Sequence, residues 1–372
     1  MARERRRPSM QFLILSFLTS CVVSLLVVRS AGAHAKLSAD HNMTGPQKFH
    51  SHPVPRVGGL GVFVGVLAGV LWAHRSDPTG AHTPCLLLLS AMPAFLAGLV
   101  EDMAGNIRPR VRLLLIAVSA GLAIWLLGAV IVRTHIPGLE LLIQWYPLAV
   151  ALTIFAVTGV ANAVNIIDGF NGLASMCALF MLLATAYVAY QVGDLSIFTA
   201  ALIISGAVLG FFVWNYPAGL IFLGDGGAYL LGFTLAELNI LLLHRNAAVS
   251  PIFPLLLCAY PIFETVFTIY RRRVVRGVAA GAPDGIHLHT LIYRRVIRAA
   301  FRDDFDQRKI ARNSMTSPYL WALCLLSVIP SVLWWDNTPV LTCFLFLFMA
   351  SYVLLYCRIL KFRTPKWLMI RR

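Results

Sequence analysis

Long apolar segments recur along the whole chain and are separated by short polar stretches. A helix needs roughly 17–25 mostly apolar residues to cross a bilayer, and the sequence of 372 residues contains about eleven such windows. They lie near residues 10–28, 57–74, 84–100, 113–132, 147–164, 172–190, 196–213, 228–243, 251–270, 318–335 and 339–357. No polar stretch between them is long enough to fold independently. The pattern therefore predicts an all-α polytopic membrane protein, with one helix bundle that forms a single domain over residues 1–372.

The first window follows a basic N-terminus, M-A-R-E-R-R-R, and so has the pattern of a signal peptide. No convincing small-residue cleavage site follows it, however, and ten further windows do. We therefore expect residues 10–28 to be the first membrane helix.

Positive charge is unevenly divided between the two ends of the predicted bundle. With eleven spans, twenty-four Lys and Arg residues fall on one face and seven on the other. The positive-inside rule makes the richer face cytoplasmic, and this face carries a large loop at 271–317 and a basic tail at 359–372. Four of the seven charges on the other face are arginines of the N-terminal tail, which conflict with this orientation of the first helix. The net charge of +15 follows from membrane topology, so no nucleic-acid partner is expected.

Composition agrees with a membrane protein, because 59% hydrophobic and 13% charged residues are too apolar for a soluble domain. All seven cysteines lie inside apolar windows and none belongs to a C-x-x-C pair. We expect small apolar packing residues rather than disulfides or metal ligands.

Polar residues that could perform chemistry gather in four clusters, all on the predicted cytoplasmic face. These clusters are the acidic pair at 101–102, the segment 162–174, the glycine-rich segment 224–227 and the segment 284–289. A transporter more typically carries its charges near the bilayer midplane, on broken helices in two repeated halves, and no such repeat is apparent. One-sided clusters favour an enzyme at the membrane interface. A lipid or solute transporter on a related scaffold is the alternative.

The segment N-A-V-N-I-I-D-G-F-N-G-L-A, residues 162–174, is the most informative of the four. An acidic residue at the edge of the hydrocarbon layer, here Asp168, is costly and is a functional hypothesis by default. Asn165 lies one helical turn earlier and would share its face. The segment predicts a metal or phosphate site at the membrane edge.

Each remaining cluster has a functional and a structural interpretation. Asp225 lies among three glycines, which suits phosphate and Mg²⁺ binding but also a tight turn before a helix. Glu101 and Asp102 could share a proton, bind a cation or act as a base, or they could be a helix end neutralised by nearby arginines. His287 and His289 could ligate zinc, transfer protons or bind phosphates, or they could be solvated without a role.

Basic residues near these clusters have similar alternatives. Lys48 and Arg56 precede the second span and are candidate phosphate contacts. Arginines that open the loop 271–317, including Arg272, could bind phosphates or anchor to anionic lipid headgroups. Glu264, in the ninth span, needs a partner when buried, and we expect one of those arginines.

Taken together and in order, the motifs resemble those of the polyprenyl-phosphate N-acetylhexosamine-1-phosphate transferases, glycosyltransferase family 4. The matching motifs are P-R-V-G-G-L-G at 55–61, the acidic pair at 101–102, the segment 162–174, F-L-G-D-G-G at 222–227, P-I-F-E at 261–264 and P-D-G-I-H-L-H at 283–289. The resemblance covers a core of about 45–298. P-R-V-G-G makes the chain look closer to the initiators of O-antigen and teichoic-acid synthesis than to the phospho-MurNAc-pentapeptide translocase.

The resemblance implies an activity. A sugar 1-phosphate, most simply that of GlcNAc, would pass from a UDP-N-acetylhexosamine to undecaprenyl phosphate, which releases UMP and initiates a lipid-linked envelope glycan. The enzyme would depend on Mg²⁺, with Mn²⁺ as a substitute, and could form a homodimer. It would lie in the inner cell membrane with its active site on the cytoplasmic face.

The resemblance also assigns roles to individual residues. Asp225 matches the metal ligand, with Asn165 as a second contact, and Asp102 and Asp168 match catalytic carboxylates. Substrate-binding roles fall to Lys48, Glu101, Asn171, Arg272, His287 and His289. Three of these motifs depart from the common pattern: Glu101 and Asn171 each replace an Asp, and Thr290 replaces a third histidine. These roles require the four clusters to meet at one place.

Overall fold

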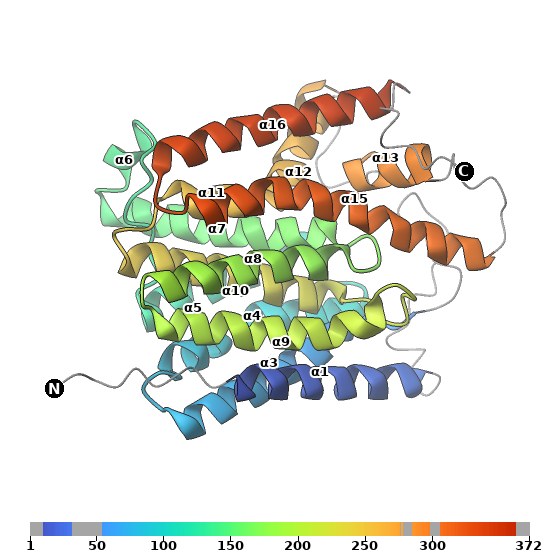
Figure 1. Cartoon of the computed structure of the whole chain (residues 1–372), viewed down its shortest axis with the longest axis horizontal. Coiled ribbons are helices and arrows are strands. Elements are labelled where there is room, and N and C mark those ends of the chain that lie inside the picture. The colour runs from blue at the N-terminus through green and yellow to red at the C-terminus, as the bar shows by residue number, and fades with distance from the viewer. Residues whose placement is uncertain (1–9, 32–53, 276, 278–284, 298–305, 362–372) are drawn as a thin grey trace.

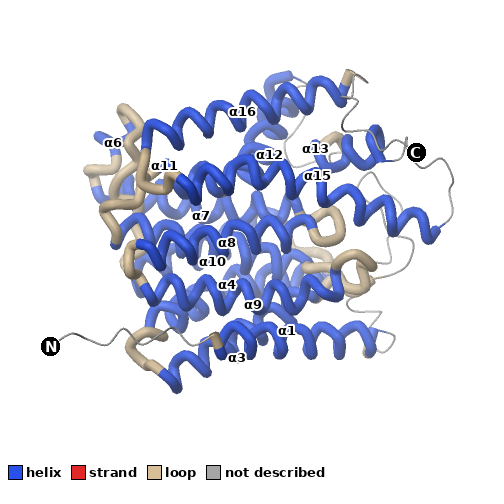
Figure 2. The backbone as a smooth tube through the Cα atoms, viewed as in Figure 1, coloured by secondary structure: helices blue, strands red, loops and turns tan. Residues whose placement is uncertain are grey.

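The computed structural model describes residues 10–31, 54–275, 277, 285–297 and 306–361. It is a bundle of long, roughly parallel helices (Figure 1), joined by loops that gather at the two ends of the bundle (Figure 2). Among the described residues, ten helices are long and apolar enough to cross a membrane. The prediction of an all-α polytopic membrane protein is therefore confirmed.

The long helices correspond to ten of the eleven predicted windows. They are α1 (Gln11–Arg29), α3 (Gly58–Ser76), α4 (His82–Ala104), α5 (Pro109–Leu127), α7 (Tyr146–Ile167), α8 (Leu173–Gln191), α9 (Leu195–Asn215), α10 (Gly224–Arg245), α15 (Asp306–Leu333) and α16 (Thr338–Leu360). Short helices α6 (Leu139–Leu142) and α13 (Leu288–Ile292) lie in the connections.

The window near 251–270 is helical but broken. It forms α11 (Ile252–Leu257) and α12 (Ala259–Tyr270), and a π-helical turn, Arg271–Val275, follows α12. Pro261 has no N–H to donate to the carbonyl of Leu257, four residues earlier, so a continuous helix would lose a hydrogen bond at this point. The break at Cys258 allows α12 to leave the line of α11.

Helix α10 is the centre of the bundle, since every residue from Gly224 to Leu243 is buried. Helices α3, α4, α7 and α8 pack around it. The N-terminus of α10 lies at the end of the bundle where α4 and α7 finish. Residues far apart in the sequence therefore meet around the first turn of α10.

Helix α1 packs at the edge of the bundle, with one face against α3 and α9, and is a candidate membrane span, as expected. Its buried face carries serines at every fourth position, and these face glycines of α3. A Cβ atom added to those glycines would lie 2.0–2.7 Å from a serine atom, in the pairs Gly69–Ser16, Gly65–Ser20 and Gly61–Ser24. Small residues of this kind let membrane helices approach closely.

This close approach predicts that a large side chain on α3 destabilises the bundle. A Cβ at Gly65 would lie 2.7 Å from Ser20 Cβ and 2.8 Å from the carbonyl oxygen of Ser16. We expect Gly65→Leu to lower the free energy of unfolding by about 2 kcal/mol or more through overpacking, measured as a lower midpoint of thermal unfolding in detergent. Gly121→Leu on α5 is the matched control, because a Cβ there meets no described atom within 4 Å. Equal midpoints for the two variants would contradict the packing account.

Candidate active site

Asp225, the second residue of α10, is the centre of a charged cluster. Its Oδ1 accepts a hydrogen bond of 3.0 Å from Asn165 Nδ2 on α7 and lies 3.5 Å from Arg56 Nη2, just before α3. Its Oδ2 pairs with Arg112 Nη1 in the first turn of α5. The carboxylate is largely buried, and two guanidinium groups and an amide surround it. Such partners are what a buried carboxylate requires.

The glycines around Asp225 permit this approach. Gly224 has φ of +75°, and a Cβ there would lie 1.9 Å from the carbonyl oxygen of Arg56 and 2.5 Å from Asp102 Oδ2. A side chain at Gly226 would lie 2.9 Å from the backbone nitrogen of Leu99 on α4. The F-L-G-D-G-G motif is therefore needed because other segments contact the start of α10 directly. Both structural and functional interpretations of this motif are compatible with the geometry.

Asp102, near the end of α4, binds the N-terminus of α10. Its Oδ1 accepts from the N–H of Asp225 at 2.8 Å and its Oδ2 accepts from the N–H of Gly226 at 2.9 Å. Arg56 Nη2 lies 3.9 Å from Oδ1, and the side chain is 1% exposed. A carboxylate here satisfies helix N–H groups that lack a partner and interacts favourably with the helix dipole. Asp102 thus sets the position of Asp225, and its predicted catalytic role stays a prediction.

Glu101 belongs to the same charged cluster through a different contact. Its Oε1 lies 3.6 Å from Arg112 Nη1, the group that also pairs with Asp225. Its Oε2 accepts a hydrogen bond of 2.7 Å from the N–H of Ile107. The acidic pair is therefore divided between two tasks, because Glu101 binds Arg112 and Asp102 binds α10.

Asp168 caps the C-terminus of α7 beside this cluster. Burial raises the pKa of its carboxyl group to about 7, and the negative charge of Asp225 acts in the same direction. The guanidinium of Arg56 and a hydrogen bond with the N–H of Gly224 oppose the shift. Asp168 and Asp225 therefore lie in one compartment and interact electrostatically. Carboxyl groups with such raised pKa values are concentrated at functional sites.

The histidine segment meets the Asp168 loop directly. The rings of His287 and His289 are stacked, with centroids 5.0 Å apart and an interplanar angle of 14°. The ring of His289 contacts the edge of Phe170, at a centroid distance of 5.5 Å. His289 Nε2 also lies 3.5 Å from where a Cβ of Gly169 would be. Gly169 and Phe170 thus join the histidines to Asp168 and the carboxylate cluster.

The prediction that an arginine pairs with Glu264 is wrong. Glu264 Oε1 instead lies 3.0 Å from His287 Nδ1 and accepts a hydrogen bond from the N–H of Leu288, while Oε2 accepts one from the hydroxyl of Tyr352. The start of α13 lies against α12 and brings His287 to the carboxylate. Glu264 is close to the arginines in the sequence, but this closeness did not predict its partner in the structure.

Asn171 makes structural contacts on the far side of its loop. Its N–H donates to Asn313 Oδ1 at 2.8 Å, and its side-chain Nδ2 donates to the carbonyl of Pro217 and to Ser314 Oγ. Its carbonyl accepts from Ser317 Oγ at 2.6 Å. The structure therefore ties Asn171 to α15 and does not bring its side chain into the contacts around Asp225. Its substrate-binding role stays a prediction.

Two of the loop arginines lie inside the protein. Arg271 and Arg272 are buried in the π-helical turn after α12, and the guanidinium carbon of Arg271 lies 5.7 Å from the centroid of the Tyr356 ring. Their burial does not fit lipid-headgroup anchors, for which exposure is needed. Lys48 lies outside the described residues.

Some residues of the site were not expected from the sequence. Arg112 was anticipated only as a neutraliser of the acidic pair, yet it also binds Asp225, 113 residues away. Tyr352 on α16 carried no local signal, because nothing near it in the sequence is unusual for a membrane helix. Contacts of this kind depend on which helices become neighbours.

The oxygen atoms of the cluster fit a magnesium ion better than zinc. No group of three or more His, Cys, Asp or Glu side chains in the described parts of the chain is arranged to hold a metal. Mg²⁺ is commonly bound by one or two carboxylates, with waters and substrate phosphates as its other ligands. Asp225 offers carboxylate oxygens, with the Asn165 amide in direct contact and Asp168 close by.

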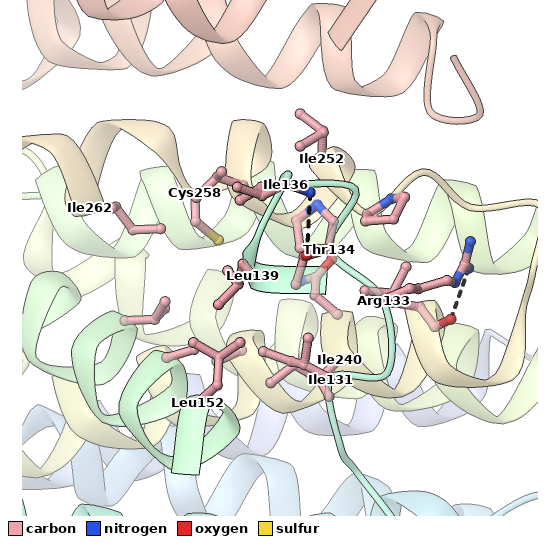
Figure 3. A pocket seen from close by; sticks show the side chains of 18 residues that line it. Ile131, Arg133, Thr134, Ile136, Leu139, Leu152, Ile240, Ile252, Cys258 and Ile262 are labelled. Atoms are coloured by element: carbon pink, nitrogen blue, oxygen red, sulfur yellow. Dashed lines mark hydrogen bonds between the residues drawn. The ribbon is translucent and has the colours of Figure 1, made fainter. Parts of the chain in front are cut away.

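A cavity at the opposite end of the bundle has a different character (Figure 3). It has a volume of about 210 Å³ and lies between α7, α10, α11 and α12, with mostly aliphatic lining residues and no carboxylate among them. Arg133 at its rim donates hydrogen bonds to the carbonyls of Leu243, Asn246 and Ala247 at the end of α10. Arg133 at the polar rim thus holds the fold, and the charged cluster around Asp225 lies at the other end of α10.

The fold and the site define a polytopic membrane protein with carboxylates, guanidinium groups and histidines at one membrane edge. Residues 84–243 match the sequence model of glycosyl transferase family 4. A relative from Bacillus subtilis (strain 168), named a probable undecaprenyl-phosphate N-acetylglucosaminyl 1-phosphate transferase, is 30% identical over 282 residues, 74% of this chain and 75% of the relative. The chain belongs to glycosyl transferase family 4, which confirms the resemblance seen in its motifs.

Two further relatives show which other transferases the chain is similar to. An undecaprenyl-phosphate alpha-N-acetylglucosaminyl 1-phosphate transferase from Thermotoga maritima is 29% identical over 279 residues, 74% of this chain and 80% of the relative. A phospho-N-acetylmuramoyl-pentapeptide-transferase from Streptococcus thermophilus is 41% identical over 93 residues, 25% of this chain and 27% of the relative. The relation to the pentapeptide transferases is therefore confirmed as well.

The geometry predicts that Asp102 contributes to stability. Asn at this position keeps one acceptor oxygen, so the N–H of Asp225 or of Gly226 loses its partner, and the favourable charge at the helix N-terminus disappears. We expect Asp102→Asn to lower the free energy of unfolding by about 2 kcal/mol, measured by thermal unfolding of the purified protein. Asp336→Asn, in an exposed turn, should leave the midpoint unchanged. An unchanged midpoint for Asp102→Asn would show that the contact with α10 is not stabilising.

Proposed function

We propose that this protein transfers GlcNAc 1-phosphate from UDP-GlcNAc to undecaprenyl phosphate. The products are UMP and a lipid-linked pyrophosphoryl sugar, the first intermediate of a cell-envelope glycan. The observation that carries the proposal is the carboxylate of Asp225, held between Arg56, Arg112 and Asn165 at the N-terminus of α10. The printed names of the two N-acetylglucosaminyl 1-phosphate transferases support the donor and the acceptor.

Charge neutralisation is the main physical requirement of this reaction. A pyrophosphate donor and a phosphate acceptor are both anions, so cations must bring them together and stabilise the charge of the transition state. Arg56 and Arg112 supply positive charge on both sides of Asp225. Asp225 with Asn165 would hold Mg²⁺, or Mn²⁺ in its place, which when bound polarises the phosphoryl group under attack.

The remaining residues position substrates rather than remove a tightly bound proton. A phosphate monoester has a second pKa near 6, so the acceptor is largely ionised at neutral pH and orientation matters more than base strength. Asp102 fixes the backbone of Asp225, and Asp168 lies where it can orient the donor. His287, His289 and Arg272 would bind the pyrophosphate, with Lys48, Glu101 and Asn171 as further candidate substrate contacts.

The membrane setting explains the position of the site. A polyprenyl chain stays in the hydrocarbon layer while its phosphate reaches the polar edge, and the carboxylate cluster lies at one end of the membrane helices. The excess of Lys and Arg on the same face supports the cytoplasmic side of the inner membrane. The one-sided cluster also disfavours a transporter, whose site would lie near the midplane.

The proposal predicts a specific product and a dependence on Asp225. Purified protein with Mg²⁺ should release UMP from UDP-GlcNAc only when polyprenyl phosphate is present. Asp225→Asn should lower kcat by about 100-fold or more, because it removes the carboxylate that would hold Mg²⁺ at the reacting phosphates. Glu237→Gln is the matched control, since Glu237 is buried on the same helix and has no partner among the described residues. No UMP from any UDP-N-acetylhexosamine, or UMP release without lipid, would refute the proposed reaction.

Removal of divalent cations tests the metal separately from the chemistry. With EDTA, UMP release should stop and should return with Mg²⁺ or Mn²⁺. In the absence of substrate, Mg²⁺ should raise the midpoint of thermal unfolding of the wild type, since a ligand bound to the folded state stabilises it. It should not raise the midpoint of Asp225→Asn. Activity that persists in EDTA would contradict the assignment of Asp225 as a metal ligand.

A further inference from the structure

A buried polar network around Glu264 has no part in the function described so far. Glu264 lies on α12 and is 0% exposed. Its Oε2 accepts a hydrogen bond of 2.7 Å from the hydroxyl of Tyr352 on α16. Its Oε1 accepts one of 3.1 Å from the N–H of Leu288 and lies 3.0 Å from His287 Nδ1. Both oxygens of this buried carboxylate are thus occupied by groups from two other segments, α16 and residues 287–288.

The hydrogen atoms of this network can be assigned. The hydroxyl of Tyr352 and the N–H of Leu288 both donate to Glu264, and an ionised carboxylate can only accept. His287 Nδ1 must then carry the proton that it shares with Glu264 Oε1. This contact fixes which nitrogen of the imidazole carries a proton, as second partners of histidine commonly do. Thr268 Oγ1 lies 3.2 Å from the same nitrogen and is a second contact for it.

The orientation of His287 is passed on to the carboxylate cluster. Its ring stacks on that of His289, and His289 contacts Phe170 and the position beside Gly169, next to Asp168. A rotation of the His287 ring would therefore displace the stacked ring and its contact with the 168–170 loop.

Aromatic packing fixes the phenol at the other end of the network. The rings of Phe263 and Phe267 meet the ring of Tyr352 edge-on, at centroid distances of 5.0 and 5.6 Å. Such T-shaped contacts restrict the ring to one orientation. The hydroxyl of Tyr352 therefore reaches Glu264 from a rigid support on α12 and α16.

We propose that Glu264 and Tyr352 are positioning residues, which hold His287 and His289 against the Asp168 loop for the transfer reaction. The last helix of the described chain, α16, lies outside the 84–243 segment that matches the family and is part of the catalytic apparatus. This inference rests on the proposed function. It goes beyond that function because it assigns a task to a helix and a carboxylate that the reaction itself does not require.

The test is Tyr352→Phe, which removes one hydroxyl and keeps the ring. We expect kcat for UMP release to fall about 10-fold, as when a residue that orients a functional histidine is changed. The KM for polyprenyl phosphate should stay within about twofold of the wild-type value. Tyr260→Phe is the matched control, because Tyr260 is equally buried on α12 and its hydroxyl has no hydrogen-bond partner among the described residues. It should keep the wild-type kcat and thermal midpoint. Tyr352→Phe leaves a buried carboxylate oxygen without its donor and should lower the midpoint, so kcat is compared well below both midpoints.

A double-mutant cycle separates positioning from general damage. His287→Gln removes the nitrogen that binds Glu264, so in this background Tyr352→Phe has nothing left to position. We expect Tyr352→Phe to lower kcat about 10-fold in the wild type and less than about twofold in His287→Gln. Independent damage would multiply the two effects instead.

The outcomes distinguish the inference from the function on which it rests. If the wild type turns over and Tyr352→Phe keeps the wild-type kcat, the positioning role is overturned and the transferase function stands. Effects that multiply in the double-mutant cycle have the same consequence. Absence of UMP from the wild type with every donor overturns both. A fall in kcat confined to Tyr352→Phe, with loss of the effect in His287→Gln, supports the inference.

Discussion

The contact between Asp102 and the N-terminus of α10 is the constraint on which the site depends. Two backbone N–H groups of α10 donate to one carboxylate of α4, and this fixes where the next side chain, Asp225, can lie. Asp225 then needs cations, because a carboxylate at a membrane edge is costly without them. Arg56 and Arg112 meet that need from two further segments. The structural and chemical tasks of the acidic residues are therefore interdependent.

Much of the fold could be predicted because the bilayer restricts it. Each apolar window has to be a helix in hydrocarbon, because backbone groups find no water there. The positions of the windows therefore predict the positions of the helices. The break near Pro261 needed a local rule on proline, and the pairing of α1 with α3 was not foreseen. Small residues at every fourth position, such as Ser20 on α1 and Gly65 on α3, permit close packing. They do not predict which helices pack together.

The site was predictable in its residue types and not in its contacts. Asp168 and Asp225 stood out because acidic residues and glycines are unusual at the ends of apolar windows. The family resemblance singled out Asn171, and its side chain and N–H contact α15. The contact between Glu264 and Tyr352 joins positions 88 residues apart, and no spacing rule reaches that far. Local pattern identifies candidates, while tertiary packing decides their partners.

In the proposed reaction, the donor phosphates bind between Asp225 and the histidine pair. An electron-density map of the protein with UDP-GlcNAc and Mn²⁺ tests it most directly, because the anomalous signal of manganese locates the ion independently of the ligand. We expect a manganese peak beside the Asp225 carboxylate and pyrophosphate density that reaches towards His289. Manganese and nucleotide density at the apolar cavity near Ile240, with none at Asp225, would contradict it.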